Sequence, residues 1–163
     1  MSVQSARTSV RLWDWAAKAW ARKEVEAAAL ELQDIHGQNV PLLLWAAWAA
    51  GQGRRLDQDT FDEAADVARA WETVAVLPLR SLRRTLKKPV PDMDGDAREA
   101  LRAQVKAVEA GAERALLEAL EPIAPKGSGG ATSIDQALVS AARAWGRTTP
   151  RVALKSFAAM LSG

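Results

Sequence analysis

Apolar residues recur every three or four positions along most of this chain, which is the period of an α-helix that buries one face. The first such stripe follows Ser9 and consists of Trp13, Ala16, Ala17 and Trp20. Similar stripes predict further helices, separated by Gly, Pro and capping residues, over about 24–36, 42–50, 61–74, 76–88, 97–120, 133–145 and 149–161.

One segment departs from this pattern because it has no polar face. Leu42 to Ala50 is apolar on all sides, and a helix of that kind normally forms the centre of a fold. Asn39 can cap its first turn, and Gly37 fits a left-handed C-terminal cap of the preceding helix. The pattern therefore predicts an all-α fold, a compact bundle of six to seven helices around a buried apolar central helix.

Other boundaries follow from local signals. Thr60 and Glu63 have the spacing of a capping box, as do Ser133 and Gln136. Pro78 removes a backbone donor and should kink or break a helix near Val74.

The predicted domain organisation is a helical main body over 1–124, a Gly-rich flexible linker over 125–132, and a C-terminal helical hairpin over 133–163 docked on the body. Residues 1–8 are expected to fray. A heptad-like seam lies between Leu101 and Ala119, and it suits either packing within the chain or a homodimer interface (Leu101, Val105, Val108, Ala112, Ala115, Ala119).

Composition strengthens the helical prediction. The 163 residues suit one domain, and good helix formers are abundant while strand-like alternation is not found. The chain has seven Trp but no Tyr and no Cys. Trp13, Trp20, Trp45, Trp48 and Trp71 have core spacings, so they either pack the interior or line a pocket, whereas Trp15 and Trp145 are candidate exposed anchors.

Charge is unevenly distributed although the net charge is only +2. Residues 56–75 hold six acids and one base, whereas 76–91 hold five bases and no acid. On a helix these five bases share one arc opposite Leu79, Leu82 and Leu86, which predicts an outer basic face (Arg80, Arg83, Arg84, Lys87, Lys88). Such a face is either simply solvated, or docks an acidic protein, or contacts phosphates.

Catalytic and metal signatures are missing from the sequence. His36, the only histidine, suits the last turn of a helix, and the Asp92–Asp96 run lacks the Gly and Glu that a calcium loop requires. Without Cys or Tyr, the usual nucleophile–base pairs cannot be assembled. We therefore expect a non-enzymatic protein with no catalytic residue, no metal and no cofactor.

The longest apolar run, Val40 to Ala50, is too short for a membrane span of about 20 residues. The first residues lack the apolar core of a secretory signal. These observations predict a cytoplasmic protein without a transmembrane segment.

Several motifs occur in a fixed order between Leu12 and Lys88: LWDWA, LQDIHG, VPLLLWAAW, GRRL, a lone Trp71 and LPLRSLRRTLK. In this order they resemble a bacterial, mainly proteobacterial, family of short proteins known only as a domain of unknown function. The resemblance implies a small cytoplasmic helical protein and brings no catalytic residue. Polar residues within the matching motifs would form any shared binding surface (Gln33, Asp34, Gly37, Arg54, Arg55, Arg80, Arg83, Arg84, Lys87).

Three functions are consistent with these features. The leading hypothesis is an interaction or adaptor protein that docks a protein partner through residues 76–88, helped by Arg54 and Arg55. The second is binding of nucleic-acid phosphates or an anionic membrane through the same bases. The third is a carrier of a small apolar ligand in a Trp-lined pocket.

Overall fold

The computed structural model describes residues 9–163; the predicted fraying of residues 1–8 lies outside this range. Within it the chain forms helices and no strand, which confirms the all-α prediction. The elements are α1 (Leu12–Trp20), α2 (Lys23–Asp34), α3 (Val40–Gly51), α4 (Gln58–Trp71), the π-helical turn η1 (Glu72–Val76), α5 (Leu77–Thr85), α6 (Gly95–Leu120), the 3-10 turn η2 (Glu121–Ile123), α7 (Ile134–Trp145) and α8 (Arg151–Leu161).

The central helix is α3, as predicted. Every residue from Leu42 to Ala49 is buried, and α1, α2, α4, α6 and α7 all pack against it. The Asn39 side chain accepts a hydrogen bond from the Leu42 N–H at 2.9 Å, and Gly37 has the expected positive φ of 64°. Burial of this apolar helix supplies the main driving force for a compact body.

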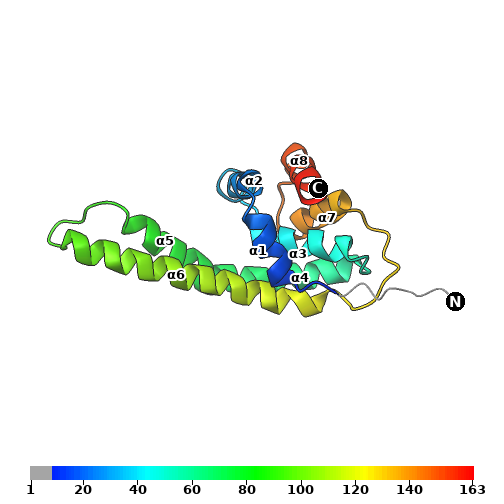
Figure 1. Cartoon of the computed structure of the whole chain (residues 1–163), viewed down its shortest axis with the longest axis horizontal. Coiled ribbons are helices and arrows are strands. Elements are labelled where there is room, and N and C mark those ends of the chain that lie inside the picture. Colours follow the sequence, from blue (N-terminus) through cyan, green and yellow to red (C-terminus); the bar gives the residue numbers. More distant parts are fainter. Residues whose placement is uncertain (1–8) are drawn as a thin grey trace.

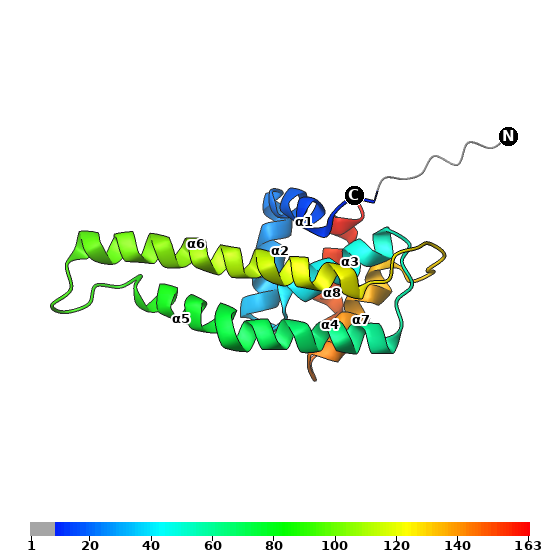
Figure 2. The same cartoon turned by 90° about the horizontal axis from the view of Figure 1, so that it is seen from below.

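A two-helix arm projects from this body (Figures 1 and 2). It consists of α5 and the distal part of α6, which lie side by side. The 26 residues of α6 correspond to about 39 Å of helix. Asp94 caps the start of α6 by accepting from the Ala97 N–H, so the acidic run at 92–96 serves a helix N-terminus.

Helices α4 and α5 are continuous through η1 rather than broken. Pro78 lies in the first turn of α5 and has no N–H to offer. The preceding turn widens, and the Leu77 N–H donates to the Glu72 carbonyl five residues earlier. The predicted kink near Val74 is therefore a π-helical turn, which also turns Glu72 towards the body.

Two predictions differ from the structure. The capping residue of α4 is Asp57, whose side chain accepts from the Thr60 N–H at 2.8 Å, so the helix begins before the predicted Thr60–Glu63 box. In α6, Leu101 and Val108 are exposed, and the buried face contains Val105, Glu109, Leu116 and Leu120 instead. The predicted seam is therefore not a packing face within the chain, and its alternative role as a homodimer interface stays a prediction.

Helices α7 and α8 complete the body. The predicted Ser133–Gln136 capping box is present at the start of α7, which packs on α3 and α4, and α8 packs on α7 and α2. The Gly-rich segment before α7 is held at one point, where the Gly130 N–H donates to the Gly53 carbonyl at 2.9 Å. This contact fixes the return of the chain onto the end of α3.

The Gly130 contact generates a stability prediction. A Cβ at position 130 would lie 2.1 Å from the Arg54 carbonyl oxygen, so Gly130→Ala should lower the free energy of unfolding by roughly 1–3 kcal/mol. At Gly111, in the middle of α6, a Cβ meets nothing within 4 Å, so Gly111→Ala should raise it by up to about 1 kcal/mol. Urea unfolding followed by circular dichroism measures both, and equal effects would contradict this account.

Candidate functional site

The basic segment is split between the inside and the outside of the arm. Arg80, predicted on the outer face, is buried, with 9% of its side chain exposed. Its Nε donates to Glu109 Oε1 at 3.3 Å and its Nη2 to Glu113 Oε1 at 3.4 Å. The prediction of an outer position is therefore wrong for Arg80, which joins α5 to α6.

Arg83 belongs to the same cluster. Its Nε donates to Glu109 Oε2 at 2.5 Å, and the pKa of Arg83 is raised chiefly by this hydrogen bond. Glu109 is 7% exposed and accepts from both guanidinium groups. Because an uncompensated buried charge is strongly destabilising, Arg80 and Arg83 both depend on Glu109.

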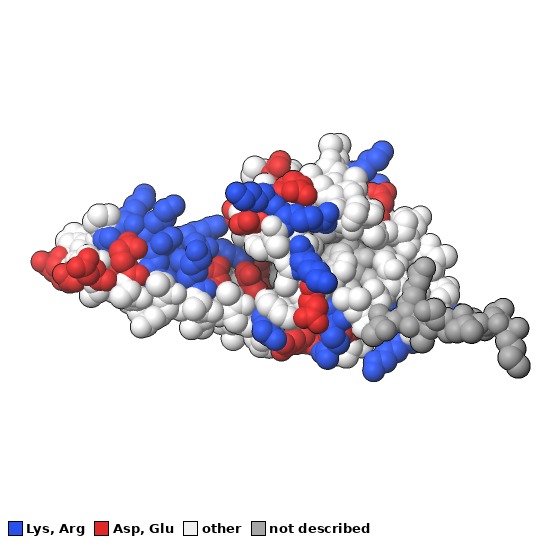
Figure 3. Space-filling view, in the orientation of Figure 1, with Lys and Arg blue, Asp and Glu red and all other residues white. Residues whose placement is uncertain are grey.

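The remaining three bases face solvent. Arg84, Lys87 and Lys88 are exposed, and Figure 3 shows that Lys and Arg side chains gather on this side of the arm. Arg84 Nη2 contacts Asp34 Oδ1 of α2 at 3.1 Å, but both side chains are about half exposed, at 58% and 46%. Surface pairs of this kind contribute little to stability, so the Arg84 guanidinium stays accessible.

The two arginines of the GRRL motif also differ. Arg54, expected to help in docking, is buried, at 7% exposed. It lies over the Trp48 ring, with its guanidinium carbon 4.2 Å from the ring centroid, and donates to the Ala124 carbonyl at 3.0 Å. Burial lowers its pKa against the opposing attraction of Glu121. Arg54 therefore has a structural role inside the body. Arg55 is exposed, but it precedes α4 and does not belong to the arm.

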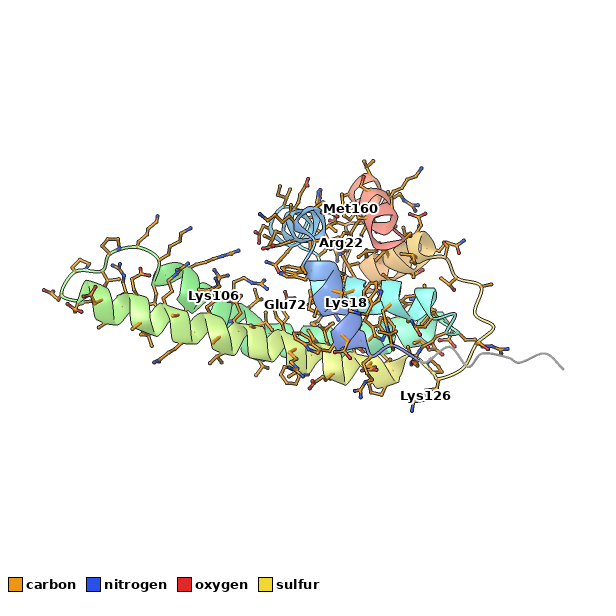
Figure 4. The ribbon with its side chains drawn as sticks, in the orientation of Figure 1. Lys18, Arg22, Glu72, Lys106, Lys126 and Met160 are labelled. Atoms are coloured by element: carbon orange, nitrogen blue, oxygen red, sulfur yellow. The ribbon has the colours of Figure 1, made fainter. Side chains whose placement is uncertain are left out.

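Neither predicted tryptophan anchor is freely exposed. Trp145 is half-buried, donates from Nε1 to the Gly37 carbonyl at 2.9 Å, and lies under Arg69. Trp15 is half-buried against the core and lines a shallow pocket with Lys18, Arg22 and Leu161. Figure 4 shows Arg22 beside Met160, whose carbonyl accepts a hydrogen bond from Arg22 Nη2 at 2.8 Å.

A polar cleft lies where the arm meets the body. Its volume is about 320 Å³, and Glu72 from η1 faces it at this junction (Figure 4). Burial raises the pKa of Glu72, while Arg80, Asn39 and Arg69 partly oppose the shift. The lining comes from α2, the turn after it, η1 and α5 (Gln33, Asp34, Gly37, Gln38, Glu72, Leu77, Arg80, Arg84).

An apolar cavity of about 290 Å³, open to solvent at Ala17 and Ala110, lies between α1, α3 and α6. Glu113 and Gln33 provide its polar end, and the remaining lining is aromatic or aliphatic (Trp13, Ala16, Ala17, Trp20, Val40, Pro41, Leu44, Ala110, Leu117). Burial raises the pKa of Glu113 and Glu109 raises it further, whereas Arg80 and Arg83 oppose the shift.

Three of these carboxylates were not singled out as site residues from the sequence: Glu72, Glu109 and Glu113. The signal for the last two was present, because Glu109 and Glu113 lie four residues apart and in register with Val105, Leu116 and Leu120. Glu72 carries no comparable signal, since its orientation depends on the π-helical turn that Pro78 accompanies.

The chemistry of the site is that of hydrogen bonding and ion pairing. In the part of the chain that the structure covers, no group of three or more His, Asp or Glu side chains is arranged to hold a metal ion. Among the same residues, no helix is both long enough and apolar enough to cross a bilayer. The arrangement offers charged and apolar recognition surfaces.

The chain belongs to the family described as "Protein of unknown function (DUF2390)", whose model matches residues 11–120. The predicted resemblance to a domain-of-unknown-function family is thus confirmed, and the match extends past Lys88 to the end of α6. It contains the arm, the polar cleft and the apolar cavity. No curated protein and no solved structure matches the chain.

The buried cluster predicts unequal effects for two glutamates of α6. Glu109→Ala leaves Arg80 and Arg83 short of a counter-charge and should lower the free energy of unfolding by about 3 kcal/mol. Glu118→Ala removes only an exposed pair with Arg114 and should cost about 0.5 kcal/mol or less. Urea unfolding of both variants checks the difference, and a similar cost would show that the Glu109 cluster is not required.

The raised pKa of Glu72 predicts that replacing this residue increases the stability of the fold at high pH but not at low pH. Because folding raises its pKa above the ordinary value of 4.5, the folded chain holds this proton more tightly than the unfolded chain. The stability that this group contributes is therefore present below that value and is lost as the pH rises through the raised pKa. Glu72→Gln, which does not titrate, should be more stable than the original chain at about pH 8 and equal to it at about pH 4. A gain of the same size at both pH values would contradict the assignment.

Proposed function

We propose that the protein is a non-enzymatic interaction protein that docks a protein partner through the outer surface of its arm. The observation that supports this most directly is that Arg84, in the last turn of α5, and Lys87 and Lys88, in the turn after it, are exposed on a segment that projects from the body (Figures 1 and 3). No acidic partner lies within ion-pair distance of Lys87 or Lys88 in the described structure. Three accessible positive charges, at the end of α5 and in the turn that follows it, suit an acidic partner.

Apolar side chains accompany these charges. Val74, Leu77 and Leu82 are 79%, 47% and 44% exposed along η1 and α5. Exposed aliphatic residues beside charged ones favour a protein surface, since partner proteins bury apolar area at the centre of an interface and pair charges at its rim. The expected partner segment therefore carries acidic residues next to apolar ones.

The same surface suits phosphates less well. The tip of the arm, next to the bases, is acidic in Figure 3, and Asp92, Asp94 and Asp96 lie there. A nucleic acid or an anionic membrane lying along the arm would meet this negative tip. No aromatic residue that could stack on a base occurs between residues 72 and 144.

Charge reversal of the exposed bases tests the proposal. The variant Arg84→Glu, Lys87→Glu, Lys88→Glu leaves Arg80 and Arg83 with their glutamates, so its helicity should be unchanged. A matched control reverses three exposed bases elsewhere, Arg143, Arg147 and Arg151. Each protein is used as bait in a native lysate, and the retained proteins are compared by mass spectrometry.

A true partner should be retained by the original chain and by the control and be lost from the arm variant. After purification, its affinity for the arm variant should fall at least about tenfold, and added salt should weaken its binding to the original chain. Identical sets of retained proteins would overturn the proposal. Loss of binding after nuclease treatment, or binding to anionic vesicles alone, would favour the phosphate alternative instead.

A further inference from the structure

The apolar cavity is a consequence of residue sizes on α1. Trp13 and Trp20 lie seven residues apart, so they occupy nearly the same helix face two turns apart, about 10 Å along the axis. Between them Ala16 and Ala17 have small side chains, which leaves space below the two rings. Val40, Pro41 and Leu44 of α3 close one side of this space, and residues of α6 close the other.

The size of the cavity suits a small ligand. Its volume of about 290 Å³ lies at the lower end of the range for small-molecule sites. An engineered apolar cavity of about 150 Å³ in another protein binds benzene, so this one has room for an aromatic ring with a short side chain.

The charge of the lining selects among such ligands. Glu113 is the one charged residue that lines the cavity, and 37% of its side chain remains exposed. Its contact with Arg80 is long, at 3.4 Å, and Arg80 is also engaged with Glu109. The carboxylate is therefore incompletely paired and could accept a further donor.

The aromatic walls favour the same sign of charge. A cation near the face of a Trp ring is attracted by the ring electrons, and Trp is the best side chain for this interaction. One face of the Trp13 ring is already covered by a cation, since the Arg114 guanidinium carbon lies 4.6 Å from its centroid, so Trp13 offers a ligand apolar contact and Trp20 is the ring left for a cation. An anionic ligand would be repelled by Glu113 and would gain no cation–π attraction from the rings.

From these observations we infer that the cavity between α1, α3 and α6 binds a small amphipathic amine, with its apolar ring between Trp13 and Trp20 and its ammonium group at Glu113. Gln33, at the same polar end, is placed to accept a second hydrogen bond from the ammonium group. This inference is independent of partner docking by the arm, because the cavity residues are not among the exposed bases of α5.

Isothermal titration of the full chain with three matched probes tests the inference. The probes are 2-phenylethylamine, 2-phenylethanol and phenylacetate, which share a ring and differ in charge. Saturable binding is expected to be tightest for the amine, at least about tenfold weaker for the alcohol, and weakest for the acid.

Two variants locate the binding. Glu113→Gln keeps the shape of the side chain and should weaken amine binding at least about tenfold while leaving the alcohol unchanged. Ala17 lines the cavity at an exposed helix position, so Ala17→Leu should fill the space without unfolding the chain and should abolish binding of every probe. Glu118→Gln and Ala27→Leu, both exposed and outside the cavity, are the matched controls and should bind as the original chain does.

The inference is overturned if the amine shows no saturable binding, if it binds no better than phenylacetate, or if binding survives Ala17→Leu. Circular dichroism and urea unfolding of each variant separate loss of the site from loss of the fold. If Glu113→Gln were unfolded, the ranking of the three probes and the Ala17→Leu result would still test whether the cavity binds amines.

Discussion

The buried guanidinium group of Arg80 constrains the arm more than any apolar contact there. A charge with 9% of its side chain exposed needs counter-charges at hydrogen-bonding distance, and Glu109 and Glu113 provide them from α6. Since these residues come from helices joined by a loop of nine residues, the pairing fixes how α5 lies along α6. Shifting one helix by a turn would leave the two buried charges, Arg80 and Glu109, without their partners.

This constraint divides the basic segment into two groups with different roles. Arg80 and Arg83 hold the arm together, and Arg84, Lys87 and Lys88 form its outer charged surface. This division matters for recognition, because the paired helices hold Arg84 in α5 and the following turn with Lys87 and Lys88 in one place, so less conformational freedom is lost when a partner binds. The surface pair between Arg84 and Asp34 adds a weak link between arm and body, which binding of a partner can replace at little cost.

Features that depend on local sequence were predictable. Eight consecutive buried residues in α3, the Asn39 cap and the Ser133–Gln136 box all follow from patterns within a few residues. The burial of Arg80 was not predictable from the sequence. Helical periodicity assumes that charged residues face water, and the carboxylates that pair with Arg80 lie about 30 residues later in the chain. The rotated face of α6 has the same origin: Glu109 occupies a buried position that a pattern of apolar residues cannot reveal. The cavity depends on three helices meeting around two alanines, so only tertiary structure defines it.

Glu113 belongs both to the charge cluster of the arm and to the polar end of the cavity, so a change at one could in principle disturb the other. The geometry limits this coupling. If Glu113 engages another donor, Arg80 keeps its bond to Glu109 at 3.3 Å, and Arg83 holds the second oxygen of the same carboxylate. Glu109 is also the more deeply buried of the two, with 9% of its side chain exposed against 37% for Glu113. The α5–α6 register therefore rests on Glu109, which leaves Glu113 the one carboxylate of the cluster that can serve the cavity without releasing the arm.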